Sequence, residues 1–292
     1  MLKFEDKFEY FRQYFNTILN EFLDKECDGI PDILKEAMVY AIKDGGKRVR
    51  PVLCFATADM LGVSLDRVEK YALAIEMIHS YSLIHDDLPA MDNDDYRRGK
   101  LSTHKKFGEA YGILAGDGLL NLAFETCLKN PCLDDKDLSA IKLLFEFAGG
   151  KGMVGGQVLD LQNERNKNAD GEELYKIYEN KTAKLIMAPI LVSSIVKGGS
   201  FYEELSGYGY NLGLLFQITD DILDVEGSLD SIGKTPHKDG LEDKLTSVKI
   251  FGLDGAKKIA EKTYRKCRDF IDRIPGSGFL KSFTDMIYFR KN

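Results

Sequence analysis

EMIHSYSLIHDDLPAMDNDDYRRGK, residues 76–100, connects a long apolar run to a cluster of aspartates and arginines. Apolar side chains recur at three-to-four-residue spacing over residues 72–84, and that period is typical of a buried helix. Pro89 cannot continue the helix, because it lacks a backbone N–H and its ring clashes with the preceding turn. The stretch therefore predicts a helix that breaks near Asp87 or Leu88. An unpaired charge at the end of a buried segment is costly, so these carboxylates need a partner.

The rest of the chain shows the same helical period, and alternating, strand-like stretches are scarce. The predicted helices cover residues 8–23, 33–42, 52–61, 68–84, 111–128, 138–148, 174–196, 205–225, 248–260 and 279–289. No repeat, low-complexity tract or Ser/Pro-rich linker divides the chain. The sequence therefore predicts an all-α fold with residues 1–292 in a single domain.

Residue types at the predicted helix ends agree with this interpretation. Asp170 with Glu173 forms a capping-box pattern, and Gly29 and Gly62 are typical of helix ends. Residues 226–240 differ, because glycines and a proline occur there among polar residues. They predict a loop directly after an acidic cluster.

Composition argues against several classes of function. Lys+Arg 40 against Asp+Glu 47 gives a formal net charge of -7, whereas broad nucleic-acid-binding surfaces are basic. The five cysteines are scattered and predict reduced thiols in a cytoplasmic protein. The acidic start MLKFEDKFEYF is unlike a signal peptide. The longest apolar stretch, residues 185–196, is shorter than the roughly 20 residues of a membrane-spanning helix, so we expect no stable membrane insertion.

A second acidic cluster, FQITDDILDVEG at residues 216–227, follows the apolar residues 212–218. On a helix, Asp220 and Asp224 lie about 40° apart around the axis and roughly 6 Å apart along it. Gln217 lies within about 60° of both. This face predicts a patch that can bind a metal, and the alternative is an ordinary solvated helix end.

The first cluster is less regular. Asp86 and Asp92 would lie about 240° apart on an unbroken helix, but the break before Pro89 allows Asp92 to return beside Asp86 as a second metal ligand. His79 falls within about 20° of Asp86 around the helix, so an imidazole lies along the approach to the site. A lone helical histidine also commonly has a structural role.

Carboxylates without accompanying His or Cys ligands favour a hard cation, Mg²⁺ above all, whose coordination substrate phosphates commonly complete. Arginine and lysine side chains bind phosphate oxygens well. Such residues near the two clusters are Lys47, Arg50, Arg97, Arg98, Lys181, Lys234 and Lys238. Each of them alone also fits an ordinary surface position, but together they predict a shared metal-diphosphate site.

One competing motif fails on its context. Gly150, Gly152 and Gly155 form a GxGxxG pattern, but it follows a predicted helix rather than a strand. A dinucleotide-binding fold needs the strand. Because the strand is missing, the sequence does not predict a dinucleotide-binding fold.

Five motifs, in this order, carry a resemblance to a known family: GGKRVRP, EMIHSYSLIHDDLPAMDNDDYRRGK, GMVGGQVLD, KTAKLI and FQITDDILD. In these motifs, and across nearly its whole length, the chain resembles the trans-polyprenyl diphosphate synthases, and within them the bacterial farnesyl diphosphate synthases. The resemblance implies an all-α bundle of about ten or more helices around a deep central cavity. It also implies that the two Asp-rich segments lie across the mouth of that cavity, usually in a homodimer.

The resemblance further implies roles for individual residues. Ligands of a Mg²⁺ cluster would be Asp86, Asp92 and Asp220, supported by Asp87, Asp221 and Asp224. The allylic diphosphate would be held by Arg97, Lys181 and Lys234, joined by Thr182 and Gln217. Isopentenyl diphosphate would be bound by Lys47, Arg50, His79 and Arg98.

The implied reaction breaks the allylic carbon–oxygen bond, joins the isopentenyl double bond to the resulting cation and releases a proton. Metal ions and cationic side chains stabilise the charge that develops on the departing diphosphate. In the family this diphosphate is thought to take the proton, and Lys181, Thr182 and Gln217 are the catalytic residues that would steady the cation. The loop 226–240 would close over the site and exclude water.

Product length in the family is set by side chains below the first Asp-rich segment. Tyr81 lies about 7 to 8 Å further down the helix than Asp86, and the small Ser82 beside it sets little limit. In the resembling enzymes an aromatic residue there, with the two-residue insertion in DDLPAMD, goes with a C15 product. Tyr81 also fits a purely structural place in the core.

The expected activity is that of a farnesyl diphosphate synthase, which condenses isopentenyl diphosphate with dimethylallyl and geranyl diphosphate to (2E,6E)-farnesyl diphosphate. Alternatives are a geranylgeranyl diphosphate synthase, an inactive partner subunit of a heteromeric synthase, and a terpene cyclase. Two positions depart from the family pattern: His237 replaces a glycine in GKTPHKD, and Ser247 stands where tyrosine often follows Lys244 and Thr246. Neither removes a predicted ligand.

Overall fold

The computed structural model describes residues 3–43, 46–129, 133–164, 166, 169–230 and 244–290. Contacts within the chain divide it into two compact units, Met1–Ile141 and Lys142–Asn292. Each unit buries its own set of apolar side chains. The all-α fold is confirmed, while a single domain around a deep central cavity stays a prediction.

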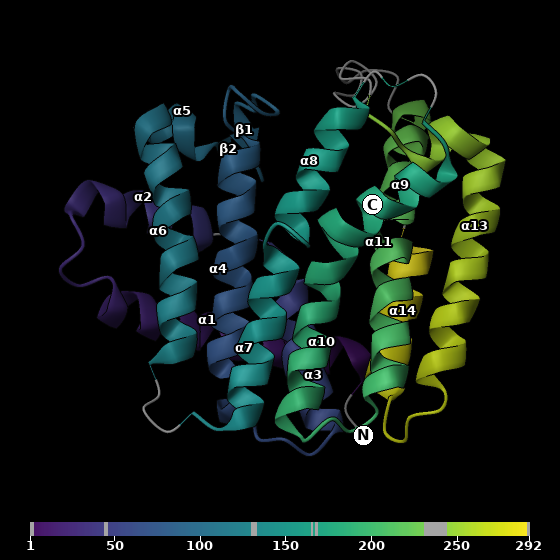
Figure 1. Ribbon diagram of the computed structural model, residues 1–292, viewed down its shortest axis with the longest axis horizontal. Coiled ribbons are helices and arrows are strands. Elements are labelled where there is room, and N and C mark those ends of the chain that lie inside the picture. The colour runs from purple at the N-terminus through teal and green to yellow at the C-terminus, as the bar shows by residue number, and fades with distance from the viewer. Residues whose placement is uncertain are drawn as a thin grey trace. The chain divides into compact units, whose positions relative to one another are not determined.

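Unit 1 consists of helices around α4. Its elements are α1 (Phe4–Glu26), α2 (Asp32–Lys43), α3 (Val49–Met60), the 3₁₀ turn η1 (Leu65–Arg67), α4 (Glu69–Asp86), the two-residue strands β1 (Tyr96–Arg97) and β2 (Lys100–Leu101), α5 (Thr103–Phe107), α6 (Glu109–Leu128) and the start of α7 (Asp135–Ala148). Residues 71–78 of α4 are all buried, because α1, α2, α3 and α6 pack against this helix. Figure 1 shows α4 and α6 running side by side.

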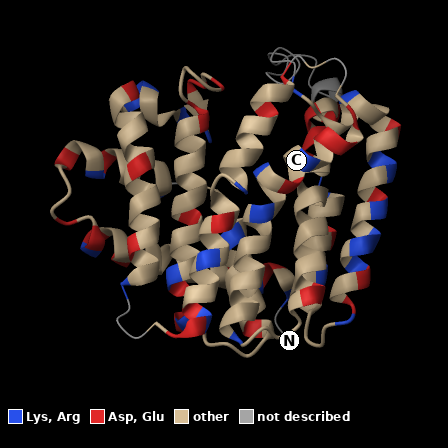
Figure 2. Cartoon of the chain, in the orientation of Figure 1, with Lys and Arg blue, Asp and Glu red and all other residues tan. Residues whose placement is uncertain are grey.

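Unit 2 is built around α10 and α11. Its elements are the rest of α7, α8 (Met153–Asn163), α9 (Gly171–Ile177), the π-helix η2 (Tyr178–Ala183), α10 (Lys184–Val196), α11 (Tyr202–Asp230), α13 (Ser247–Ile271) and α14 (Gly278–Phe289). α10 is buried along most of its length, and α11 packs against α10, α13 and α14. Figure 2 shows many charged residues along α13, whereas α4 of unit 1 has few. Of the helices in the described residues, none combines the length and the apolar composition needed to cross a membrane.

Each predicted helix other than 174–196 coincides with an observed one, but the bounds differ by up to 11 residues, at the C-terminal end of α13. Residues 174–196 differ in kind, because the π-helix η2 interrupts them. The capping box is present, because the Asp170 side chain accepts from the amide of Glu173 and the Glu173 side chain accepts from the amide of Asp170. Gly29 and Gly62 have φ angles of 78° and 67°, as helix-ending glycines do.

The predicted loop over residues 226–240 was wrong at its start, because α11 continues to Asp230. Glu226 lies 2.6 Å from the Lys257 ammonium of α13, so an ion pair ties this part of α11 to its neighbour. Residues 231–243 are outside the part of the chain that the structure describes.

The sequence analysis missed α8, whose first turns contain the glycines of GMVGG. Glycine weakens a helical signal, but it is required here by a close approach of two backbones. A Cβ at Gly156 would lie 2.2 Å from the backbone nitrogen of Lys181 in η2. α8 follows the helix α7, so the GxGxxG pattern is not preceded by a strand, as expected.

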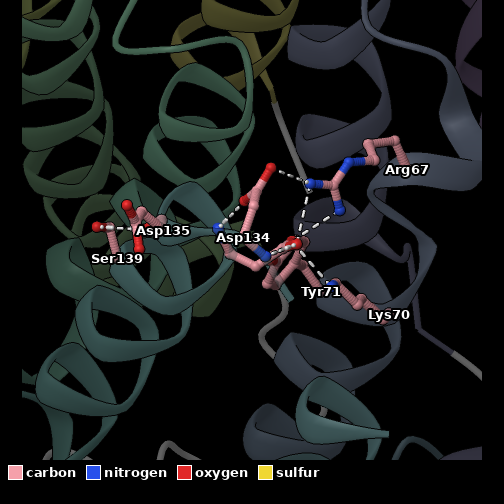
Figure 3. A network of polar contacts seen from close by, with 7 residues as sticks. Arg67, Lys70, Tyr71, Asp134, Asp135 and Ser139 are labelled. Carbon is pink, nitrogen blue, oxygen red and sulfur yellow. Dashed lines mark hydrogen bonds and ion pairs between the residues drawn. The ribbon is translucent and has the colours of Figure 1, made fainter. Parts of the chain in front are cut away.

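A buried carboxylate, Asp137, ties α7 to α4 and η1 (Figure 3). It accepts hydrogen bonds from Arg67 at 2.7 Å, from Lys70 at 2.9 Å and from the hydroxyl of Tyr71 at 2.6 Å. The amide of Asp134 adds a bond of 3.2 Å. Burial alone would raise the pKa of Asp137, but the bonds from Arg67, Tyr71 and Lys70 outweigh burial and hold this pKa well below its usual range.

Asp137→Asn should lower the free energy of unfolding at pH 7 by about 3 kcal/mol, because the neutral amide cannot compensate the cations around it. The folded pKa of Asp137 is depressed, so its contribution is complete above the unfolded value of about 3.9 and is lost as the pH falls through the folded value. Urea denaturation at pH 7 and in steps from pH 4 down to pH 2 measures both effects. Asp135→Asn, at an exposed position in the same helix, is the matched control. Equal stability of Asp137→Asn and the parent at pH 7 would contradict this account.

Candidate active site

The chain turns back on itself directly after α4. The amide of Asp92 donates to the carbonyl of Asp86 at 2.8 Å, and the amide of Asp94 donates to the carbonyl of Asp87 at 3.1 Å. Asn93 takes a positive φ of 50°, which asparagine tolerates better than most residues. The predicted return of Asp92 to the neighbourhood of Asp86 is therefore present, and both side chains are partly exposed.

Asp87 differs from Asp86, because its side chain is buried and paired. It is 2% exposed and accepts from Nε of Arg97 at 2.9 Å and also from Nη2 of the same guanidinium. Burial works against the charge on Arg97, but the bond and the charge of Asp87 prevail, so the pKa of Arg97 is raised. Two predicted site residues are thus held together at the β1–β2 turn, where Arg98 and Gly99 have positive φ.

Two of the predicted isopentenyl diphosphate residues, Arg50 and Arg98, lie close enough to the third, His79, to affect its charge. Burial lowers the pKa of His79 well below its ordinary value, and the positive charges of Arg50 and Arg98 lower it further, so the ring is neutral at pH 7. A Cβ at Gly46 would lie 2.7 Å from Nη1 of Arg98, which places this guanidinium against the segment that carries Lys47. Unit 1 therefore brings Arg50, Arg98 and His79 into one positively charged region.

Arg48, which the sequence analysis did not single out, fixes that segment. Its φ is 51°, and its side chain is buried. The guanidinium donates to Oε1 of Glu76 in α4 at 2.8 Å and to the carbonyls of Ile42 and Lys43 at 2.8 and 2.9 Å. No local pattern distinguishes a buried arginine from its exposed neighbours, so only the fold identifies this role.

Tyr81 is buried in α4, and its ring lies 5.7 Å from the ring of His85 in an edge-on arrangement. Burial and the charge of Asp86 raise the pKa of Tyr81 to about 12, so the phenol stays protonated. Ser82 is half-buried and donates to the carbonyl of His79 at 2.9 Å. The predicted role of Tyr81 and Ser82 in product length remains open at this point.

Unit 2 contains a pocket of about 140 Å³ between η2 and α11, here called the η2 pocket. Four predicted site residues line it: Lys181, Thr182, Gln217 and Asp221. Its other lining residues were not predicted: Asp160, Ile177, Tyr178, Lys244, Leu245 and Thr246. A π-helix such as η2 is rare and often occurs at functional sites, but a helical period cannot reveal it.

Asp160 of α8 is the missed residue with the clearest role. Its carboxylate accepts from the ammonium of Lys181. α8 can approach η2 closely enough for this bond because Gly156 has no side chain. The motif GMVGGQVLD, which contains both Gly156 and Asp160, was the available signal.

Gln217 is oriented by a chain of hydrogen bonds. The hydroxyl of Thr182 donates to its Oε1 at 2.9 Å, and its Nε2 donates to Oδ1 of Asp221 at 3.2 Å. The other oxygen of Asp221 accepts from the amide and the hydroxyl of Ser247, each at 2.7 Å, and from the hydroxyl of Tyr178. Burial raises the pKa of Asp221 although these donors favour its charged form.

This arrangement explains the departure from the family pattern at Ser247. The hydroxyl and the backbone amide of Ser247 both donate to Oδ2 of Asp221, and the hydroxyl of Tyr178 donates to the same oxygen. The first residue of α13 is thereby anchored to α11 and η2. Three donors already surround Oδ2 of Asp221, so its predicted support of a metal cluster would act through its other oxygen or through its neighbours.

Asp220 and Asp224 lie on the unbroken part of α11, as predicted. Asp220 is paired with Arg290, which follows α14: Nη2 of Arg290 lies 2.6 Å from Oδ1 of Asp220. Lys234 and His237 fall outside the described residues. The predicted convergence of both acidic clusters on one metal stays a prediction.

The donor set fits a magnesium ion whose coordination a substrate completes. In the residues that the structure describes, no three His, Cys, Asp or Glu side chains are grouped closely enough to hold a metal by themselves. Mg²⁺ characteristically uses one or two carboxylates together with waters and substrate phosphates. The partly exposed pair Asp86 and Asp92 meets that requirement.

Comparison with known proteins gives an independent result. Residues 31–274 match the family described as polyprenyl synthetase. The chain is 46% identical over 286 residues to a farnesyl diphosphate synthase of Micrococcus luteus. The matched region covers 97% of this chain and 98% of that enzyme. It is 40% identical over 268 residues to a chloroplastic geranylgeranyl pyrophosphate synthase of Capsicum annuum, and this match covers 90% of this chain and 73% of that enzyme. Among solved structures, it is similar to a Helicobacter pylori geranyltransferase complexed with magnesium and isoprenyl diphosphate, with a TM-score of 0.82, 31% identity and coverage of 98% and 97%.

Asp221→Asn should disturb the η2 pocket without removing bulk. In one orientation, the new NH₂ group at position 221 would face the donors of Ser247 and Tyr178. In the other orientation it would face the NH₂ group of Gln217, whose amide would then have to rotate to present its oxygen. We expect about 2 kcal/mol of lost stability and a fall in kcat on the order of tenfold or more. Thermal denaturation and steady-state kinetics measure the two effects.

Ser247→Ala is the matched control, because it removes one donor to Asp221 and leaves Gln217 bonded. It should cost only about 1 kcal/mol and leave kcat near that of the parent. If Asp221→Asn matched Ser247→Ala in both measurements, the proposed orientation of Gln217 by Asp221 would be wrong.

Proposed function

Because the chain belongs to the polyprenyl synthetase family, we propose that it condenses isopentenyl diphosphate with dimethylallyl and then geranyl diphosphate to form (2E,6E)-farnesyl diphosphate. The chain is a prenyltransferase of the farnesyl diphosphate synthase type. The observation that carries the proposal is the turn after α4, where the amide of Asp92 bonds to the carbonyl of Asp86 beside the Asp87–Arg97 pair. This turn brings Asp86 and Asp92, which would bind the metal, near Arg97, which would bind the diphosphate.

Mg²⁺, when bound, would neutralise the diphosphate and so favour breakage of the allylic carbon–oxygen bond. The residues that would hold it are Asp86, Asp92 and Asp220, supported by Asp87, Asp221 and Asp224. All of them provide hard oxygen donors, which Mg²⁺ prefers.

The cationic side chains would bind the two diphosphates. The allylic diphosphate would contact Arg97, Lys181 and Lys234. Isopentenyl diphosphate would contact Lys47, Arg50, His79 and Arg98. A neutral His79 would donate one hydrogen bond, while the arginines beside it supply the positive charge.

The η2 pocket would steady the allylic cation. Gln217 and Thr182 offer oxygen atoms to it, and the bonds to Asp221 hold Gln217 in one orientation before the reaction begins. Asp160 holds the ammonium of Lys181, which lines the same pocket. The departing diphosphate would accept the proton that the condensation releases.

A geranylgeranyl diphosphate synthase is the second candidate, since the chain is also 40% identical to an enzyme of that name. The buried ring of Tyr81, in the α4 turns below Asp86, favours the shorter product because it would fill the space that a longer chain needs. A non-catalytic partner subunit is disfavoured by the intact Asp86–Asp92 turn and the polar network of the η2 pocket.

Purified protein incubated with Mg²⁺, isopentenyl diphosphate and dimethylallyl diphosphate should release mainly a C15 diphosphate, as measured by chromatography of the dephosphorylated products. Tyr81→Ala should lengthen the product toward C20, because it removes the ring below the site. Tyr81→Phe keeps the ring and should keep the C15 product. A C20 main product from the parent would contradict the farnesyl assignment, and no product would favour a partner subunit.

We further propose that the chain forms a homodimer through α6. Exposed apolar side chains on this helix are Tyr111, Ile113, Leu114, Phe124 and Leu128. A helix that is apolar on its buried and its exposed sides is typically covered on both. A second copy of the same helix would provide that cover.

Leu114→Lys should convert the dimer to a monomer, because it places a charge within the proposed contact. Light scattering should give twice the 32.9 kDa of one chain for the parent and the single value for the variant. Ile33→Lys, at an exposed apolar position of α2, is the control and should remain dimeric. A monomeric parent would refute the dimer.

A further inference from the structure

Arg290 and Asp220 form an ion pair at a residue proposed above as a magnesium ligand. Nη2 of Arg290 lies 2.6 Å from Oδ1 of Asp220. The side chain of Arg290 is 13% exposed and that of Asp220 is 45% exposed. The cation is therefore the buried partner, and the carboxylate is the one that solvent reaches.

Arg290 is held in place by more than this ion pair. The same Nη2 lies 2.8 Å from the carbonyl oxygen of Phe216 and 2.7 Å from the hydroxyl oxygen of Thr219. The guanidinium also lies over the ring of Phe216, 4.6 Å from its centroid. The binding place of Arg290 is thus formed by α11 itself, in the turn that precedes Asp220.

Three oxygens share the two hydrogens of this Nη2. If Asp220 turned away, the oxygens of Phe216 and Thr219 would still satisfy both hydrogens. Asp220 can therefore turn away while both hydrogens of Nη2 keep an acceptor. Arg290 cannot turn away without losing three acceptors and its contact with the ring of Phe216. The carboxylate is the exchangeable member of the pair.

We infer that Arg290 is a resident counter-cation of Asp220, which weakens magnesium binding to the free enzyme and makes it depend on the diphosphate. To bind a metal ion, Asp220 would have to turn away from the guanidinium, which stays on Phe216 and Thr219 as a neighbouring positive charge. A diphosphate brings negative charge that offsets this repulsion, so metal and diphosphate bind best together. The inference rests on the proposed function, in which Asp220 is a metal ligand.

Mn²⁺ titration, followed by electron paramagnetic resonance, tests the inference on the whole chain with and without inorganic diphosphate. Without diphosphate, Arg290→Gln should bind Mn²⁺ on the order of tenfold more tightly than the parent, since a neighbouring positive charge is removed. With diphosphate the difference should shrink. Arg290→Lys keeps the charge and should stay closer to the parent than Arg290→Gln does.

Arg265→Gln is the matched control, because it removes the same charge from an exposed residue of α13 that pairs with Glu261. It should leave Mn²⁺ affinity unchanged. Asp220→Asn tests separately whether Asp220 is a metal ligand and whether Arg290 acts through it. This variant should bind Mn²⁺ more weakly than the parent, and the double variant with Arg290→Gln should bind it no differently from Asp220→Asn alone.

Unchanged or weaker Mn²⁺ binding by Arg290→Gln, with the expected loss in Asp220→Asn, would overturn the inference and leave the proposed function intact. Unchanged binding by Asp220→Asn would instead remove Asp220 from the metal site and overturn both. If Arg290→Gln does not fold, a crystal structure of the parent with Mn²⁺ and diphosphate decides. Arg290 on Phe216 and Thr219 with Asp220 turned to the metal supports the inference, and a retained Arg290–Asp220 pair beside bound metal refutes it.

Discussion

The hydrogen bond from the Asp92 amide to the Asp86 carbonyl is the constraint on which the first acidic cluster depends. A buried helix must end there, because Pro89 cannot continue it, and the freed carbonyl needs a donor. The returning chain supplies that donor and brings a second carboxylate with it. The same turn places Arg97 against Asp87, so one backbone solution organises both the acidic and the basic side chains of this segment.

Unit 2 reaches a comparable result by packing instead of by a turn. Gly156 lets α8 approach η2, and Asp160 can then bind Lys181. Asp221 joins Gln217 to the first residue of α13, so the polar side chains of the η2 pocket are fixed before any ligand arrives. Asp220, one residue earlier, is a partly exposed carboxylate paired with the less exposed guanidinium of Arg290. Adjacent aspartates thus have opposite surroundings, and their roles differ accordingly.

The sequence was sufficient for what depends on local periodicity and on strong breakers. Pro89 predicted the end of α4 and the return of Asp92, and the spacing of Asp220 and Asp224 predicted a shared helix face. It was insufficient where two distant segments decide the outcome. Gly227 suggested a loop, yet α11 continues through it to Asp230, and Glu226 pairs there with Lys257 of α13. Arg48 and Arg290 carry no local signal that separates them from surface residues, because their roles come from partners that only the fold supplies. Asp160 lies in the motif GMVGGQVLD, but its partner Lys181 is likewise supplied only by the fold.

We propose that Asp86, Asp92 and Asp220 bind one magnesium-diphosphate cluster. A crystal structure of the chain with Mg²⁺ and an unreactive thio analogue of dimethylallyl diphosphate tests it most directly. The account predicts oxygens of all three aspartates on magnesium ions that share the same diphosphate. Magnesium and diphosphate held by one acidic cluster alone, with the other cluster free of metal, would contradict it.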